Sequence, residues 1–143
     1  MADTIQLEIV TPERLVVNVA VDEIQIPGKT GYLGILPGHA PLISELSAGG
    51  EISYRTGTEV KRLAVAWGFA EVLPHKVTIL AETAERAEDI DVARARAAKQ
   101  RAEEELRKAG AGGDAEAQAA LQRANTRIDV ASKLNGQLAN FTP

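Results

Sequence analysis

Four arginines are the residues of this chain whose spacing most clearly points to chemistry. Arg94 and Arg101 precede a glycine-rich break at residues 110–113, and Arg123 and Arg127 follow it. From the middle of the break, Arg101 and Arg123 lie about ten and eleven residues away, and Arg94 and Arg127 about seventeen and fifteen. If the flanking segments are antiparallel helices, the arginines lie level in pairs on one flank, because successive helix residues turn by about 100°. Such a cluster of guanidinium groups is typical of an anion site.

The simpler interpretation is that each arginine pairs with an acidic residue three or four positions away, which contributes about 0.2 to 0.5 kcal/mol. This accounts for two of the four, because Arg94 has Asp91 and Arg101 has Glu104 and Glu105. The other two have no acidic residue at those positions and are themselves four residues apart, a like-charge pair. Three explanations of that pair stay open at this point: a bound anion, an acidic segment of another protein, or plain solvation.

Two helices are predicted around the break, each with one narrow apolar stripe. The first stripe is Val92, Ala95, Ala98, Ala102, Leu106 and Ala109, and the second is Ala117, Ala120, Leu121, Ala124, Ile128, Ala131 and Leu138. Asp89 or Asp91 is suited to cap the first helix and Asp114 the second. Because alanine buries little apolar area, we expect a marginally stable hairpin that is a candidate for a moving part.

The first half of the chain has the alternation and turns of an all-β sandwich, over about residues 3 to 82. Alternating apolar residues predict strands: Ile5, Leu7, Ile9; Val17, Val19, Val21; Ile24, Ile26; Leu63, Val65, Trp67; Val77, Ile79, Ala81. Turn sequences rich in proline and glycine separate them, and eight of the twelve glycines lie in this half. Trp67 and Phe69 are expected to anchor a core made mainly of valine, isoleucine and leucine.

Composition and missing motifs exclude several classes of function. The chain has 143 residues, no cysteine and a net charge of −4, so thiolate zinc sites and a general nucleic-acid binder are not expected. No apolar run reaches the roughly 18 residues of a membrane span and no signal peptide is evident, which favours a soluble intracellular protein. Gly28-Lys29-Thr30 lacks the upstream glycine of a phosphate loop, and the two histidines, His39 and His75, have no metal-site spacing. No nucleophile and base can be placed together, so the chain is not expected to be an enzyme.

Three stretches carry a resemblance to a known family: GYLGILPGHAPLI at residues 31–43, GFAEV at 68–72 and VTILAETAERAEDIDVARA at 77–95. The chain closely resembles the epsilon subunit of F-type ATP synthases over essentially its whole length. The resemblance implies a sandwich of two antiparallel sheets with about ten strands at residues 1–84, followed by a two-helix hairpin at residues 85–143. It also implies a non-catalytic subunit of the central stalk that binds the gamma subunit and the ring of c subunits.

The resemblance further implies a loop that contacts the c ring. Its residues would be Gly31, Tyr32, Leu33, Gly34 and His39, with glycine allowing a tight turn and close approach of the backbone. Tyr32 stands where related bacterial subunits can carry glutamate, so the polar contact expected there becomes aromatic or hydroxyl-mediated. The implied location is peripheral, on the cytoplasmic face of a bacterial plasma membrane, with the thylakoid membrane as the alternative.

By the same resemblance, the hairpin extends up the stalk to restrain ATP hydrolysis and binds ATP when it is folded down. Residues 90–95 match an Ile-Asp-x-x-Arg-Ala motif, and Arg123 and Arg127 match a later Arg-x-x-x-Arg. The implied ATP site is Glu85, Asp91, Arg94, Arg101, Arg123 and Arg127. The guanidinium groups would take the phosphates, and the acidic residues the adenine and ribose.

The implied mechanism is a population shift in which ATP binds only the compact hairpin. No cofactor is required, ATP is a regulatory ligand, and a role for magnesium stays open. When the hairpin extends, its arginines could instead contact the alpha and beta subunits of the catalytic head. An alternative of another class is a free-standing nucleotide sensor, which would not co-purify with gamma.

Overall fold

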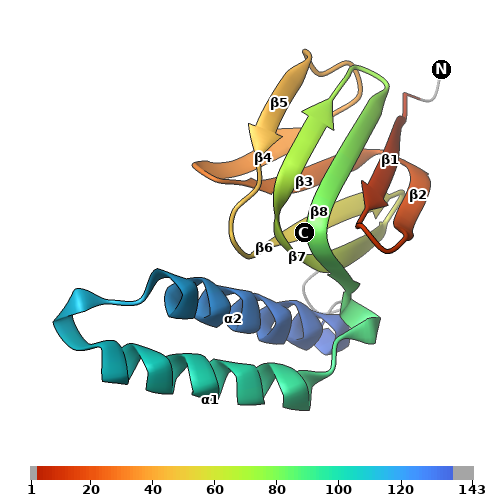
Figure 1. The fold of residues 1–143 in the computed structure, drawn as a ribbon. Helices are drawn as coiled ribbons and strands as arrows, with labels where there is room; N and C mark the ends of the chain where they lie inside the picture. The colour runs from red at the N-terminus through yellow and green to blue at the C-terminus, as the bar shows by residue number, and fades with distance from the viewer. Residues whose placement is uncertain (1–2, 137–143) are drawn as a thin grey trace.

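The computed structural model describes residues 3–136, with a strand-rich body above a pair of helices (Figure 1). The strands are β1 (Ile5–Val10), β2 (Leu15–Val21), β3 (Glu23–Gly28), β4 (Gly31–Ile35), β5 (Leu42–Glu45), β6 (Gly50–Thr56), β7 (Glu59–Val72) and β8 (Lys76–Arg86). The short helix η1 (Ala87–Asp89) leads to α1 (Val92–Ala109), and η2 (Gly110–Gly112) connects α1 to α2 (Ala115–Gly136). The predicted order, a β sandwich followed by a helical hairpin, is confirmed.

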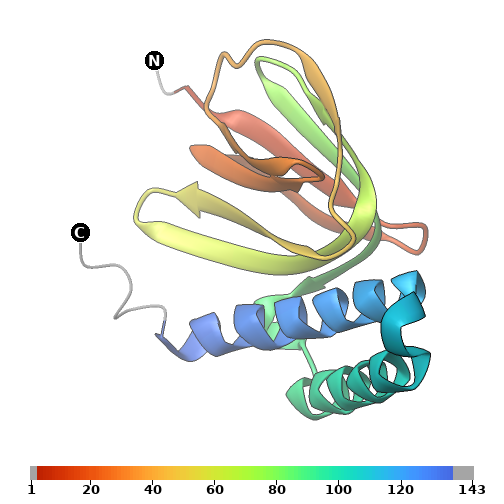
Figure 2. The same cartoon turned by 90° about the vertical axis from the view of Figure 1, so that its left-hand side faces the viewer.

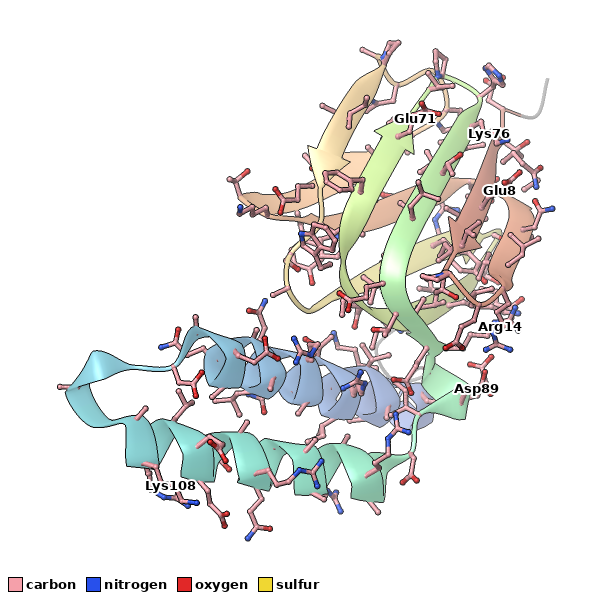
Figure 3. The ribbon with its side chains drawn as sticks, viewed as in Figure 1. Glu8, Arg14, Glu71, Lys76, Asp89 and Lys108 are labelled. Carbon is pink, nitrogen blue, oxygen red and sulfur yellow. The ribbon has the colours of Figure 1, made fainter. Side chains whose placement is uncertain are left out.

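The strands hydrogen-bond in the order β2-β1-β8-β7-β6-β3-β4, with β5 on β7. The first half of β7 pairs with β6 and its last residues pair with β5, so this long strand belongs to both layers of the sandwich. The described residues contain eight strands rather than about ten, and β1 runs parallel to β8 rather than antiparallel. An ion pair between Lys76 Nζ and Glu8 Oε1, 3.2 Å apart, bridges these two strands (Figure 3).

Aliphatic side chains fill the space between the layers, as the alternation predicts. Each fully buried side chain of this kind contributes about 1.5–3 kcal/mol. The largest fully buried side chains are Ile5, Leu7, Ile9, Ile24, Ile26, Ile35, Leu46, Ile52, Leu63, Ile79, Val21 and Val72. The sandwich therefore has its own core, which does not include the hairpin.

The expectation that Trp67 and Phe69 anchor this core is wrong, because each is 45% exposed. Trp67 has a φ of 30°, which interrupts the alternation of β7. Leu63 and Val65 face the core before this point, and Ala70 faces it afterwards, so the inward-facing positions change from odd to even. The two aromatic rings consequently point outward and contact each other edge to face, with centroids 5.5 Å apart.

Helix α2 lies between α1 and the sandwich in both views (Figure 2). It packs on α1 along the predicted alanine stripes and contacts β6, β7 and η1 on its other side. Val130, which is fully buried, packs there with Ala64, Ala87 and Ile90. This second apolar face was not predicted, and Leu138 of the predicted stripe lies outside the described residues. No helix within residues 3–136 is both long and apolar enough to cross a membrane.

Candidate functional site

Two of the predicted arginines meet at one carboxylate where the strands end and the helices begin. Glu85, near the end of β8, accepts a hydrogen bond on Oε1 from Nε of Arg127, at 2.7 Å. Nη2 of Arg94 lies 4.0 Å from the same oxygen. The side chains of Glu85 and Arg127 are only 23% and 20% exposed, whereas that of Arg94 is 70% exposed. The strong contact is therefore between α2 and β8, and Arg94 stands at its edge.

A groove between α1 and α2 brings the remaining two predicted arginines together with Arg127. Its volume is about 450 Å³, and Arg101, Arg123 and Arg127 line it above a floor of alanines. Glu105, Asp114 and Glu116 line it as well. Within residues 3–136, Arg101 has no carboxylate within 4.0 Å, so its guanidinium remains available to an anion. The small alanine side chains leave the room that the groove occupies.

The like-charge pair on α2 has acidic partners, but not at the positions that local spacing would find. Arg123 Nη2 is 2.9 Å from Glu116 Oε1, seven residues earlier, and Arg127 pairs with Glu85 of the sandwich. Arg94 pairs with Glu85 rather than with Asp91, and Arg101 makes no ion pair with Glu104 or Glu105 among the described residues. The acidic partners of Arg94, Arg123 and Arg127 therefore all lie outside the spacing of three or four residues.

Two of the predicted caps are present. Asp91 is the N-cap of α1, and its Oδ1 accepts a hydrogen bond from the backbone nitrogen of Arg94 at 3.0 Å. Asp114 precedes α2 and accepts one from the backbone nitrogen of Ala117 at 3.0 Å. Asp89 lies instead in η1 at the junction (Figure 3).

The residues of the implied ring-contact loop are separated. Gly31 to Gly34 lie in β4, at an edge of the sheet, rather than in a loop. Tyr32 is 62% exposed, and its hydroxyl accepts a hydrogen bond from the backbone nitrogen of Glu51 at 3.2 Å. His39 follows the other end of β4, where its Nδ1 is 2.7 Å from the carbonyl oxygen of Ala40. Gly31 and His39 therefore lie at opposite ends of β4.

A second candidate site is an apolar face that sequence reasoning missed. Exposed apolar side chains gather on β5, β7 and β8, and we name this set the apolar face: Ile43, Trp67, Phe69 and Leu80. An open cavity of about 470 Å³ is lined by three of these residues and by Pro12. The one signal in the sequence is the Trp67-Gly68 pair, because glycine permits the φ of 151° found at Gly68.

The indole of Trp67 is held in place on this face. Its Nε1 donates a hydrogen bond to Oε2 of Glu45 at 2.8 Å, and Lys29 Nζ lies 3.5 Å from the other carboxylate oxygen. The hydrogen bond from Trp67 is the main cause that lowers the pKa of Glu45 below its ordinary value; desolvation opposes it, and the charge of Lys29 assists it. Strained backbone and fixed aromatic rings of this kind are common where proteins bind partners.

Comparison with known families covers both parts of the chain. Residues 4–87 match the family described as "ATP synthase, Delta/Epsilon chain, beta-sandwich domain". Residues 88–132 match the family described as "ATP synthase, Delta/Epsilon chain, long alpha-helix domain". The two matches meet at η1.

Individual proteins are similar as well. The ATP synthase epsilon chain of Koribacter versatilis (strain Ellin345) is 68% identical over 110 residues, 77% of each chain. The ATP synthase epsilon chain of Solibacter usitatus (strain Ellin6076) is 47% identical over 134 residues, 93% of this chain and 99% of the relative. A chain in the cryo-EM structure of the Euglena gracilis mitochondrial ATP synthase (OSCP/F1/c-ring, rotational state 1) shares the fold, with a TM-score of 0.66 and 20% identity over 96% of this chain and 83% of that chain.

Proposed function

Since the chain belongs to the delta/epsilon family of ATP synthase subunits and its relatives are epsilon chains, we propose that it is the epsilon subunit in the central stalk of a proton-translocating F-type ATP synthase. In this proposal the subunit is not a catalyst. The sandwich joins the gamma subunit to the c ring, and the hairpin regulates ATP hydrolysis by binding ATP. The subunit is peripheral, on the cytoplasmic face of the membrane, and the bacterial relatives favour a plasma membrane over a thylakoid.

The convergence of Arg101, Arg123 and Arg127 on one groove is the observation that carries the regulatory part of the proposal. Ligand pockets are commonly about 300–1,000 Å³, so the groove has the size for a nucleotide. Each charge-assisted hydrogen bond from a guanidinium to a phosphate contributes about 1.5–3 kcal/mol. Arg101 is available to an anion at once, while the phosphates would have to displace carboxylates from the other two arginines.

Displacement of Glu85 links ATP binding to the junction between the two parts of the chain. When Arg127 turns to a phosphate, Glu85 is freed to accept hydrogen bonds from the adenine or ribose, beside Asp91 at the start of α1. Helices α1 and α2 must be side by side for these groups to converge. ATP therefore binds only the folded hairpin, and at a concentration one hundred times its dissociation constant it stabilises that state by about 2.7 kcal/mol.

Scarce ATP then releases the hairpin, which extends along the stalk toward the alpha and beta subunits and restrains hydrolysis. A calorimetric titration of the isolated protein with ATP and with ADP, each with and without magnesium, tests this mechanism. We expect saturable binding that favours ATP. Absence of binding at physiological nucleotide concentrations would instead assign the arginines to a protein interface and leave the subunit with the coupling function alone.

The apolar face is the part of the sandwich best suited to bind gamma. Large apolar patches on one side of a domain mark interaction sites, and aromatic residues at their centre commonly contribute most of the binding energy. Lys29 and Glu45 adjoin Trp67 and provide polar groups at its rim. We expect gamma to cover Trp67 and Phe69 with apolar side chains.

Replacing Trp67 by alanine is expected to weaken association with gamma by about 2 kcal/mol or more, roughly 30-fold, because the largest side chain of the apolar face is lost. Binding of the purified variant to gamma, measured by surface plasmon resonance, checks this result. The matched control is Leu134→Ala, which removes an exposed apolar side chain from α2, away from the apolar face. Equal affinities of the Trp67 variant and the parent protein would place the gamma interface elsewhere.

A further inference from the structure

Helix α2 lies close to the backbone of the sandwich at Gly49, in the segment just before β6. A Cβ atom at Gly49 would lie 3.0 Å from both Cα and the backbone nitrogen of Arg123 and 3.2 Å from the carbonyl carbon of Gln122. Such distances are tighter than ordinary Cβ packing, so a side chain at this position would require the helix backbone to shift by a few tenths of an ångström. The side chain of Gln122 donates a hydrogen bond from Nε2 to the carbonyl oxygen of Gly49, at 2.8 Å.

A second contact joins the last turns of α2 to β6, the strand that follows Gly49. Nζ of Lys133 donates a hydrogen bond to Oε1 of Glu51 on β6, at 2.9 Å, and lies 3.2 Å from Asp129 of its own helix. The side chain of Glu51 is only 16% exposed, and its other oxygen lies 3.5 Å from Nε of Arg62. Burial opposes the charge of Lys133, but the hydrogen bonds and charges of Glu51 and Asp129 outweigh it and raise the pKa of Lys133. The lysine is therefore charged at neutral pH, and the pair persists.

The contacts at Gly49 and Glu51 do not involve the arginine side chains that we propose to bind an anion in the groove. The contacts at Gly49 involve the backbone of residue 123 and the side chain of residue 122, and neither depends on a guanidinium group. Glu51 does not line the groove either. Val130, which is fully buried, lies on the same side of α2. These three contacts bind the side of α2 that faces away from α1 to the sandwich.

We infer that Gly49 with Gln122, and Glu51 with Lys133, form a latch that holds the hairpin on the sandwich without nucleotide. This inference rests on the proposed mobility of the hairpin. The latch sets the fraction of molecules in the docked state, and the apparent dissociation constant of ATP is its intrinsic value divided by that fraction. The latch therefore tunes the ATP concentration at which the hairpin releases, and it does so without using a side chain that we propose to touch ATP.

The distance between the sandwich and α2 in the absence of nucleotide tests the latch directly. The chain has no cysteine, so spin labels can be attached at Thr58→Cys, in the turn before β7, and Gln118→Cys, on α2. Both sites are exposed. Pulsed electron resonance then gives the docked and released populations as short and long distances.

Gly49→Ala is expected to raise the released population about tenfold, because the added methyl group must push the helix backbone away. Lys133→Gln should raise it about threefold, since the ion pair is partly exposed. Gly112→Ala is the matched control, because a Cβ atom there meets nothing within 4 Å, and it should keep the parent distances. A doubly substituted protein, Gly49→Ala with Lys133→Gln, that keeps the parent distances would overturn the latch.

Failure of the latch can be distinguished from misfolding of a variant and from failure of ATP binding. Lys133→Gln leaves the sandwich core untouched, so a normal thermal transition combined with release supports the latch even if Gly49→Ala proves poorly folded. If the parent protein does not bind ATP, the proposed regulation fails, but the distances without nucleotide still decide the latch. If ATP does bind, Gly49→Ala should need several-fold more ATP than the parent to restore the short distance.

Discussion

Replacing Arg127 by alanine is expected to lower the affinity for ATP by about 10- to 100-fold, because each charge-assisted hydrogen bond contributes about 1.5–3 kcal/mol. Arg127 lines the groove and is 20% exposed, so its guanidinium is positioned where solvent screens it little. The sandwich should unfold at the parent temperature, because its core does not include this residue. Calorimetric titration with ATP, together with a thermal melt, measures both quantities.

Three further variants make this prediction specific. Arg127→Lys keeps the charge but loses the planar fork, and should recover only part of the affinity. Arg94→Ala should have a smaller effect, about threefold, because the side chain is 70% exposed. Arg96→Ala removes an exposed arginine of α1 that does not line the groove, and should bind ATP like the parent. Unchanged affinity in both the Arg94 and Arg127 variants would mean that ATP does not bind at these arginines.

Replacing Gly68 by alanine is expected to destabilise the sandwich by about 3 kcal/mol or more. A Cβ atom at this position would lie 1.9 Å from the carbonyl oxygen of Leu80, an overlap with backbone that no side-chain rotation relieves. The φ of 151° is also unfavourable for alanine. Both effects act at the point where β7 changes its partner strand from β6 to β5. Chemical unfolding followed by circular dichroism gives the free energy of unfolding.

Gly34→Ala is the matched control for this substitution. It introduces the same methyl group into a strand of the same sandwich, where nothing lies within 4 Å. Its free energy of unfolding should stay within about 0.5 kcal/mol of the parent value. Equal stability of the Gly68 and Gly34 variants would show that β7 relaxes around the added methyl group. The orientation of Trp67 would then not depend on the glycine beside it.

Gly68 also connects stability with function. The same irregularity that requires glycine turns Trp67 and Phe69 out of the core and onto the apolar face. A core position for these rings would have stabilised the sandwich further, but the surface would then lack its two aromatic side chains. The chain thus has a strained strand beside the surface that we propose for gamma.

Much of the fold follows from local patterns. Alternation and turn residues predict most of the strands, because a strand with one buried face must alternate every second residue. The caps at Asp91 and Asp114 and the glycine-rich break predict the two helices, because capping and helix propensity depend on neighbouring residues only. Counting residues from the break likewise predicts that Arg101 lies near Arg123 and Arg127, which line one groove with it.

Contacts between residues far apart in the sequence were decided by the tertiary structure alone. The partner of Arg127 is Glu85, 42 residues away, and that of Arg123 is two helical turns away, so a search at three or four positions finds neither. The outward turn of Trp67 depends on a single backbone angle in β7. The closeness of Gly49 to α2 depends on how that helix crosses the sheet. Periodicity reports which side of an element is buried, but only packing determines which element buries it.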